Sequence, residues 1–349
     1  MKKVSSVILA CLIFMSCSVC VFAAQYGDAD ELQQLRDRFT DGVGPEVNGF
    51  ALDYALFTPG SAETDGEKRP LVVWLHGMGE GAKPRAQLEK NNFVYWASDD
   101  FQSRFPTGGA YLAAVRSPEE KGLFWTNEMI EPLMALITEL MATENIDASR
   151  VYLGGFSMGG KMTIRTAITY PNAFAAIFPI CPASSFTPEQ LEYIKDVPMW
   201  LTVSSRDVLA GWYTYSRDIW NNYCAVTSRG ADSRLSLLGR VCFPDGTKTI
   251  SNHHAWYAVT YDMFTYSGDK YYNMNTVSAD GTAVELTYPD GMISWLGSHT
   301  SSYTGEALTP SGGYPLTEKH VKSLADSLMP MLKSLVCVLL EVLTAACGL

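Results

Sequence analysis

The chain has 349 residues, of which 47% are hydrophobic and 18% are charged, and this composition excludes a mainly disordered or fibrous protein. The formal net charge is −11 and no basic stretch occurs that would neutralise phosphates, so nucleic-acid binding is not expected. The length suits one large α/β domain with additional segments, or two small domains.

The N-terminus has the pattern of a secretory signal peptide. Two lysines open the chain, an apolar run follows over 7–24, and Val21 and Ala23 fit the small residues that precede a cleavage site. We expect residues 1–23 to be removed and the protein to be secreted, with no stable membrane span left. Two alternatives stay open: the run is kept as a membrane anchor, or Cys17 makes it a lipoprotein signal.

From residue 71 onward, short apolar runs alternate with helical patterns. Buried strands are predicted over 71–75, 111–115, 151–153, 175–180 and 199–203, and helices over 128–143 and 158–170. Strands that alternate with helices indicate βαβ units. The sequence therefore predicts an α/β fold with a mostly parallel central sheet flanked by helices.

The last part of the chain changes character. A further strand is predicted over 235–242, a strand over 282–287, a short helix over 292–296 and a loop over 301–316. From residue 317 apolar residues step by three and four, which predicts an amphipathic helical tail over 317–349 that breaks at Pro330. We expect this tail to pack on the preceding domain over 24–300. A role at a membrane surface or in dimerisation is the alternative.

Five cysteines follow the signal segment. None of them forms a CxxC pair, and no cluster of cysteine and histidine has zinc-ligand spacing, so neither a metal nor another cofactor is expected. Cys224 and Cys242 are the best-placed pair for a disulfide. The alternative is that all five are small buried apolar residues.

The segment Gly155-Phe156-Ser157-Met158-Gly159 is a G-x-S-x-G motif. It directly follows the strand predicted over 151–153 and opens the helix predicted over 158–170. A sharp strand–turn–helix of this kind lifts a serine hydroxyl above a sheet, and small residues on either side let the backbones approach. The motif predicts Ser157 as a nucleophile. The alternative is a glycine-rich loop with an idle serine.

A serine nucleophile needs a base and a carboxylate that orients the base. Asp207 comes directly after the strand predicted over 199–203, where the acid of such a triad belongs, and we expect it to be the acid. Asp218 is the fallback, although it lies in a helical stretch.

Histidines after Ser157 are the candidates for the base. His253 and His254 follow the strand predicted over 235–242, and sequence spacing alone does not choose between them. His299 and His320 lie far into the trailing segments and are not preferred.

Acyl transfer also needs backbone N–H donors that hold the oxyanion. One donor is expected from Met158, the residue after the nucleophile. The other is expected from the loop 76–81, His-Gly-Met-Gly-Glu-Gly, which follows an early strand. We choose the N–H of Met78, with Gly77 as the second choice, and His76 would then be structural. No Lys-Ser or Lys-Thr follows, so the loop does not read as a phosphate loop.

These segments together resemble the secreted α/β-hydrolase esterases related to polyhydroxybutyrate depolymerases and feruloyl esterases, often labelled prolyl-oligopeptidase-like. The matching segments are WLHGMGEG at 74–81, GAYLAAVRSP at 109–118, SRVYLGGFSMGGKMT at 149–163, FAAIFPIC at 174–181, PMWLTVSSRD at 198–207 and NHHAW at 252–256. The resemblance covers roughly residues 70–296, and it implies an α/β-hydrolase fold for the domain.

Carried over residue by residue, the resemblance implies Ser157 as nucleophile and Asp207 as acid. It selects His253, three residues before Trp256, as the base and leaves His254 in a variable position. Two departures are seen: Asn252 replaces the family's usual glycine, and Val208-Leu209-Ala210 replaces the Val-Pro that often follows the acid. Both change loop shape near the site and leave the reaction class unchanged.

The resemblance implies a secreted serine hydrolase that cleaves carboxylic esters through an acyl-enzyme. Relatives of this type cleave feruloyl or acetyl esters on polysaccharides, polyester chains or simple esters, and we expect a carbohydrate-linked or simple ester here. Trp125, Trp256 and His254 are the candidate pocket residues, and a packing role for Trp125 is the alternative. A serine peptidase, a lipase and a non-catalytic binding protein on the same scaffold are the rival functions.

Overall fold

The computed structural model describes residues 28–63, 66–89, 93–118, 124–239, 274–285 and 291–315. The predictions for the signal segment 1–23, for His253, His254 and Trp256, and for the tail over 317–349 lie outside the described residues.

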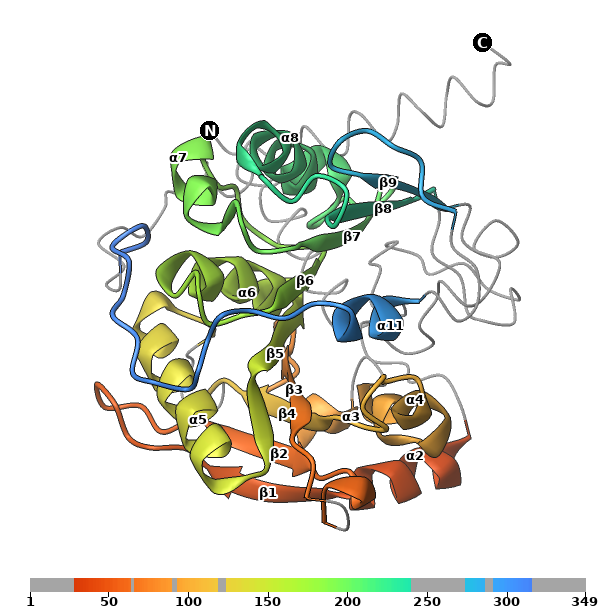
Figure 1. The fold of residues 1–349 in the computed structure, drawn as a ribbon, viewed down its shortest axis with the longest axis vertical. Helices are drawn as coiled ribbons and strands as arrows, with labels where there is room; N and C mark the ends of the chain where they lie inside the picture. Colours follow the sequence, from red (N-terminus) through yellow and green to blue (C-terminus); the bar gives the residue numbers. More distant parts are fainter. Residues whose placement is uncertain are drawn as a thin grey trace, which may run out of the picture.

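The described residues form one nine-stranded sheet in the order β1-β2-β4-β3-β5-β6-β7-β8-β9 (Figure 1). Its strands are β1 (Phe39–Val43), β2 (Asp53–Phe57), β3 (Arg69–Leu75), β4 (Tyr111–Arg116), β5 (Ile146–Phe156), β6 (Ala176–Ile180), β7 (Trp200–Ser204), β8 (Arg234–Leu238) and β9 (Met274–Ser278). Pairs β1–β2, β2–β4 and β8–β9 are antiparallel, whereas the inner pairs from β4 to β8 are parallel. The predicted mostly parallel sheet is therefore confirmed.

The inner strands are apolar because both of their faces are covered. Every residue of β3, β4, β6 and β7 is buried, as is usual for parallel strands between two helical layers. On one face, the rings of Trp74 and Phe178 stack with centroids 6.2 Å apart, and Trp96 stacks on Phe178 at 5.7 Å. These rings fill the core directly beneath the carboxyl ends of β3 and β6.

Helices lie on both sides of the sheet (Figure 1). They are α2 (Ala29–Asp37), α3 (Ala86–Glu89), α4 (Asp99–Ser103), α5 (Ile130–Thr143), α6 (Met158–Thr169), α7 (Pro188–Leu191), α8 (Arg217–Val226) and α11 (Met292–Gly297). Single turns at Gly60–Glu63, Phe93–Ala97, Asn127–Met129, Glu192–Ile194 and Trp212–Ser216 complete the described helical segments. The helices predicted over 128–143, 158–170 and 292–296 are confirmed as α5, α6 and α11.

The strand prediction at the end of the domain is wrong. The sequence favoured 282–287, but the described part of that range, 282–285, lies in no strand; the strand is β9, which ends before the turn at Asp280-Gly281. Gly281 takes a φ of +88° there, and Asp280 Oδ1 accepts a hydrogen bond from Thr282 N at 2.9 Å. The residues before this turn form the strand because they pair with β8. After the turn, Ala283 makes an isolated bridge to Val277.

Residues 300–315 contain neither helix nor strand, but they are tied to the domain along their length. Ser301 N donates to Ser149 O at 2.8 Å, and Ser311 N donates to Thr169 O at 2.8 Å. Near the end, the guanidinium of Arg165 lies 4.9 Å from the ring centroid of Tyr314. The segment crosses the molecule from α11 to the neighbourhood of α7 as an ordered strap (Figure 1).

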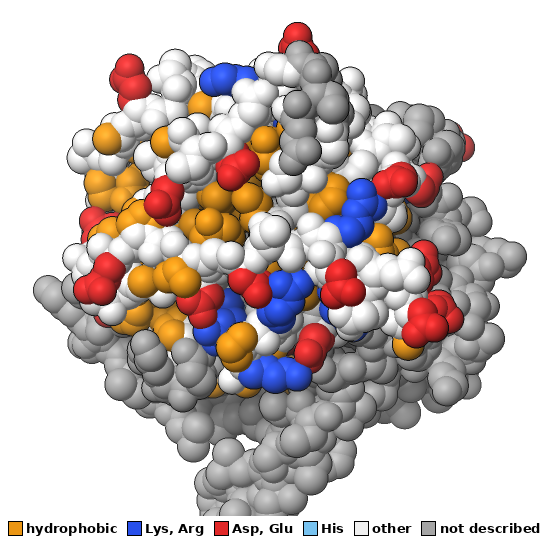
Figure 2. Space-filling view, turned by 90° about the horizontal axis from the view of Figure 1, so that it is seen from below, with side chains coloured by type: hydrophobic (Ala, Val, Ile, Leu, Met, Phe, Trp, Pro, Cys, Tyr) orange, Lys and Arg blue, Asp and Glu red, His pale blue; other side chains and the backbone are white. Residues whose placement is uncertain are grey.

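The surface around β1 and α2 mixes charges of both signs with apolar side chains (Figure 2). Ion pairs on it include Arg38–Asp99 at 2.9 Å and Arg85–Asp41 at 2.5 Å. In the described ranges we find no helix that combines the length and the apolar character needed to cross a membrane.

Candidate functional site

Ser157 stands at a sharp turn between β5 and α6. Its φ is +56° and its ψ is −111°, a conformation that L-residues rarely adopt and that costs about 1–3 kcal/mol. Hydrogen bonds hold the turn: Ser157 N donates to Ile180 O at 2.9 Å, and Ala183 N and Lys161 N both donate to Ser157 O. A strained serine held this firmly between a strand and a helix has the geometry of a nucleophile elbow.

Two glycines of the motif are needed because backbones approach closely at this turn. A Cβ on Gly159 would lie 2.0 Å from Leu75 O, and a Cβ on Gly155 would lie 2.6 Å from the carbonyl carbon of Gly159. Neither contact is possible for a larger residue without displacing α6 from β3. The G-x-S-x-G spacing is therefore a requirement of the packing of this helix on this sheet.

Asp207 lies two strands away from the serine. It follows the carboxyl end of β7, and β7 is separated from β5 by β6 alone, which puts about 10 Å between the two strands. The side chain is fully buried, and its Oδ1 accepts hydrogen bonds from Leu209 N at 2.8 Å and Ala210 N at 3.1 Å. A buried carboxylate fixed at this edge of the sheet suits an acid that orients a base.

The fallback acid, Asp218, is in a different environment. It lies in the first turn of α8 and its side chain is 61% exposed, with Arg217 Nε 3.5 Å from its Oδ1. A solvent-facing carboxylate on a helix is less suited to orient a base than the buried Asp207.

In the loop that follows β3, one of the two candidate oxyanion donors already makes a hydrogen bond within the loop. Gly77 N donates to Glu80 Oε2 at 2.7 Å, and Glu80 is almost fully buried. This N–H is engaged, so Met78, the first choice from the sequence, remains the candidate donor from this loop. Met78 is 45% exposed, as expected for a residue at the mouth of a site. Sequence reasoning missed the role of Glu80, although a single carboxylate among the glycines of the loop was a signal that could have found it.

His76 is locked beneath this loop as a neutral ring. Its Nδ1 donates to Gly77 O at 2.7 Å, and its Nε2 accepts from Ser117 N at 3.0 Å. Complete burial, together with the charge of Arg116, lowers the pKa of His76 to about 4. With both ring nitrogens engaged, His76 cannot act as a base toward Ser157.

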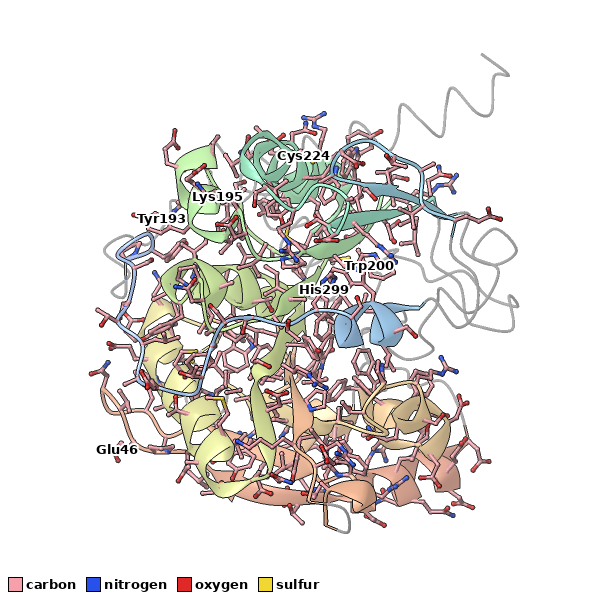
Figure 3. All side chains as sticks on the ribbon, in the orientation of Figure 1. Glu46, Tyr193, Lys195, Trp200, Cys224 and His299 are labelled. Atoms are coloured by element: carbon pink, nitrogen blue, oxygen red, sulfur yellow. The ribbon has the colours of Figure 1, made fainter. Side chains whose placement is uncertain are left out.

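His299 lies at the wrong end of the sheet to act as the base. Its ring meets Trp295 edge-on at 4.7 Å, and Trp295 in turn meets Trp200, the first residue of β7, at 5.3 Å (Figure 3). Asp207 and Ser157 both follow carboxyl ends of strands, so the length of β7 separates His299 from them. Burial lowers the pKa of His299 to about 4.

Trp125 lies in the interior and supports the loop. It is 1% exposed, its Nε1 donates to His76 O at 2.9 Å, and its ring lies 5.2 Å from that of His76. This geometry supports the packing alternative and gives no surface for a substrate.

The remaining predicted site residues, His253, His254, Trp256 and the disfavoured His320, lie outside the described residues. Cys224 is a free, half-buried thiol in α8 (Figure 3), and burial raises its pKa to about 11. Its predicted disulfide partner, Cys242, lies outside the described residues. Within the described ranges, no group of three or more His, Cys, Asp or Glu side chains could hold a metal ion.

Comparison with known proteins links the central part of the chain to ester hydrolases. The family model described as Phospholipase/Carboxylesterase matches residues 61–210, which include β3, the loop after it, Ser157 and Asp207. Among solved structures, a thermostable esterase is 28% identical with a TM-score of 0.48, covering 55% of this chain and 52% of that one. An acylaminoacyl peptidase of Pyrococcus horikoshii is 20% identical with a TM-score of 0.41, covering 54% of this chain and 35% of that one.

Two curated relatives carry esterase descriptions. The bifunctional acetylxylan esterase/xylanase XynS20E of Neocallimastix patriciarum is 29% identical over 132 residues, which are 38% of this chain and 18% of that protein. NocK of Nocardia uniformis subsp. tsuyamanensis, described as an esterase, is 27% identical over 175 residues, which are 48% of this chain and 49% of that protein. The chain thus spans less than half the length of both relatives.

Sheet order, the strained serine between β5 and α6, and the family match agree with one another. The chain has an α/β-hydrolase fold, and its residues 61–210 match the family model described as Phospholipase/Carboxylesterase.

Proposed function

We propose that this protein is a serine hydrolase that cleaves carboxylic esters through an acyl-enzyme. The observation that carries the proposal is the conformation of Ser157, whose positive φ is maintained by hydrogen bonds to the ends of β6 and α6. Strain of this kind persists only where the surroundings impose it, and it concentrates at functional sites. The esterase descriptions of the relatives support the same reaction class.

In the proposed mechanism, Ser157 Oγ attacks the ester carbonyl carbon while its proton passes to the base. The N–H groups of Met158 and Met78 then hold the negative oxygen of the tetrahedral intermediate. The base returns the proton to the departing alcohol, and an acyl-enzyme remains. Water attacks the acyl group with the same base accepting its proton, and the acid product leaves with Ser157 restored.

We propose His253 as the base and Asp207 as the acid that orients it. Support by elimination comes from the two described histidines, because His76 has both ring nitrogens engaged and His299 lies at the opposite end of β7. Further support comes from the rigid hydrogen bonding of Asp207 Oδ1, which fixes the carboxylate at the edge where such a base would stand.

For the substrate we propose an acetyl or aromatic acyl ester on a carbohydrate. The relative XynS20E is described as an acetylxylan esterase, which supports a carbohydrate-linked ester. We further propose that the protein is secreted after removal of residues 1–23. N-terminal sequencing of the protein exported by an expression host tests the cleavage, and an N-terminus at residue 24 is the expected result.

The decisive experiment is hydrolysis of p-nitrophenyl acetate and methyl ferulate by the mature protein. Turnover should be lost in Ser157→Ala, and labelling by a fluorophosphonate probe should be lost with it. His253→Ala should lose turnover as well, whereas the matched variant His254→Ala should keep most of it. Folded protein that neither turns over an ester nor takes the probe would leave a binding protein on a hydrolase scaffold, and cleavage of peptides alone would leave a peptidase.

A further inference from the structure

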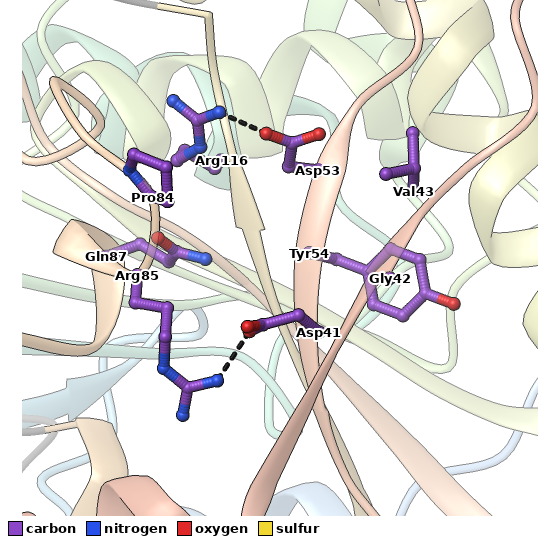
Figure 4. A pocket seen from close by; sticks show the side chains of 9 residues that line it. All are labelled: Asp41, Gly42, Val43, Asp53, Tyr54, Pro84, Arg85, Gln87 and Arg116. Carbon is purple, nitrogen blue, oxygen red and sulfur yellow. Dashed lines mark hydrogen bonds and ion pairs between the residues drawn. The ribbon is translucent and has the colours of Figure 1, made fainter.

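The loop that follows β3 is anchored at both of its ends by bonds from distant parts of the chain. At its start, Trp125 Nε1 donates to His76 O at 2.9 Å. At its end, Arg116 Nη1 donates to Gly81 O at 3.0 Å. Arg116 is fixed in turn because it pairs with Asp53 across β4 and β2, and Figure 4 shows this ion pair in the pocket that both side chains line. The two ends of the loop are therefore held in place.

Between these anchors, glycines leave the loop backbone free to adopt many conformations. They stand at positions 77, 79 and 81, and Gly79 has a φ of +81°, which a residue with a Cβ rarely adopts. The proposed oxyanion donor, the N–H of Met78, lies between two of these glycines. An amide in such a segment keeps one direction only where bonds hold the peptide groups around it.

Glu80 supplies these bonds. Its Oε2 accepts the Gly77 N–H at 2.7 Å, and its own N–H donates to Gly77 O at 3.3 Å. One residue thus binds both backbone polar groups of Gly77, and the ring of His76 adds a second bond to Gly77 O, from Nδ1 at 2.7 Å. The side chain of Glu80 is 4% exposed, so little water competes for the Gly77 N–H.

The bonds to Gly77 O also set the direction of the next amide. Gly77 C=O and Met78 N–H belong to one peptide group, and in a trans peptide these two bonds point in opposite directions. Because Gly77 O points into the loop, toward Glu80 N and His76 Nδ1, the Met78 N–H points out of it. Within the described ranges this N–H has no acceptor, and Met78 is 45% exposed. The amide is therefore available to a substrate oxygen.

The loop lies against the turn that carries the nucleophile. A Cβ on Gly77 would lie 2.8 Å from Cδ1 of Phe156, the residue that precedes Ser157. A Cβ on Gly159 would lie 2.6 Å from His76 O. The start of the loop and the start of α6 are therefore neighbours, as an oxyanion site with one donor from each segment requires.

We infer that Glu80 is a positioning residue of the oxyanion site. It touches no reacting atom, and it acts through Gly77, whose peptide groups it holds so that the Met78 N–H faces the substrate carbonyl. Because this donor is fixed before the substrate arrives, no reorganisation is needed when charge develops on the oxygen. The inference rests on the proposed hydrolase function, and it gives this carboxylate a role in the rate as well as in the fold.

Two substitutions separate the hydrogen bond of Glu80 from its charge. Glu80→Gln keeps the length of the side chain and an oxygen that can accept the Gly77 N–H, but it removes the charge. Glu80→Asp keeps the charge, but it is shorter by one methylene and no longer reaches this N–H. Loss of one oxyanion donor costs about 10²–10³-fold in kcat, so Glu80→Asp should lose about 100-fold on p-nitrophenyl acetate with little change in KM. Glu80→Gln should retain most of the wild-type kcat.

All rates are compared per active site, counted by titration with a fluorophosphonate, so that unfolded protein does not lower kcat. Glu89→Ala is the matched control and should keep the wild-type rate, because Glu89 is a carboxylate of α3 that pairs with Lys83 at 2.9 Å and lies outside the loop. A trifluoromethyl ketone forms an adduct with Ser157 that carries the oxyanion. It should bind to Glu80→Asp more weakly, by a factor similar to the fall in kcat.

Wild-type kcat per site in Glu80→Asp would overturn the inference. A fall in Glu80→Gln as large as that in Glu80→Asp would overturn it as well, since the retained hydrogen bond would then not be what maintains the rate. A loss confined to the number of titrated sites would show a role in folding alone and would also overturn it. These outcomes leave the proposed hydrolase function intact, whereas a wild-type protein that turns over no ester and takes no probe contradicts that function and the inference with it.

Discussion

Gly159→Ala tests whether the approach of α6 to β3 is what positions the serine. The added Cβ would lie 2.0 Å from Leu75 O, 2.5 Å from Leu75 C and 2.6 Å from His76 O. All three are backbone atoms of the strand end and of the loop that follows it, so no side chain can rotate away. An ordinary van der Waals contact begins at 3.4 Å, and the helix must therefore move by more than 1 Å at its first turn.

Two effects follow from that displacement. Overpacking of a core contact costs roughly 1–3 kcal/mol, and a contact this short belongs at or above the upper end of that range. Ser157 and Met158 move with the helix, and a displacement of about 1 Å at a catalytic group can cost about 100-fold in rate. We expect a lower denaturation midpoint in urea together with a fall of about 100-fold in kcat on p-nitrophenyl acetate.

Gly60→Ala is the matched control. Gly60 is exposed, has nothing within 4 Å of an added Cβ, and has no positive φ, so the substitution should leave kcat unchanged and stability equal or slightly higher. If Gly159→Ala kept the wild-type midpoint and rate, the close approach of helix and strand would not be the constraint that fixes the elbow, and the reasoning would be refuted.

Three further predictions concern buried side chains around the sheet. Asp207→Asn should lower kcat by about 10⁴-fold with little change in KM, as loss of the orienting carboxylate does in other triads, and a fall under tenfold would argue against that role. Burial lowers the pKa of His299 to about 4, so between pH 6.5 and 4 the unfolded chain binds a proton that the folded chain does not. Stability should therefore fall as the pH falls through this window. In His299→Phe, the stability measured by urea denaturation should depend less steeply on pH. Trp125→Phe removes the donor to His76 O and should cost about 1–3 kcal/mol of stability, and an unchanged midpoint would contradict the packing role.

The elbow was predictable from sequence because its determinants are local. The end of a strand, a serine and the start of a helix lie within a few consecutive residues. Glycines are required at 155 and 159 because backbone atoms approach them closely at the same turn. Inner strands were predictable for a related reason: a strand buried on both faces must be a continuous apolar run. β3 and β4, buried at every position, are runs of this kind.

Edge strands were not predictable in the same way. β1 has the sequence Phe-Thr-Asp-Gly-Val, and only Phe39 in it is buried. Such a segment shows neither an apolar run nor a clean alternation, and it becomes a strand because β2 provides a partner. At the opposite edge, β9 and the wrongly predicted 282–287 lie on either side of one turn, and only the pairing with β8 distinguishes them.

Contacts between distant segments account for the rest of the site. The hydrogen bond from Trp125 to His76 joins residues 49 positions apart, and no local sequence pattern predicts it. Arg116 and Asp53 are 63 positions apart and meet because antiparallel pairing of β2 with β4 places them directly opposite each other. Candidate residues can therefore be chosen from sequence by type and by place after a strand, but their partners depend on the order of strands in the sheet.

The choice between Gly77 and Met78 illustrates what the structure adds to the sequence prediction, which preferred Met78 and kept Gly77 as the second choice. Both amides belong to one loop, and glycine would ordinarily be favoured as the residue that lets a backbone approach a substrate. Glu80 accepts the Gly77 N–H at 2.7 Å, and this bond closes the loop on itself and leaves the next amide as the candidate donor. A buried carboxylate beside a developing oxyanion would repel it, so the bond to Gly77 has a second consequence: it directs one carboxylate oxygen into the loop backbone. The loop is thus shaped by an acidic residue whose charge would oppose the proposed chemistry, and the bond from the Gly77 N–H turns one of its oxygens toward the loop backbone.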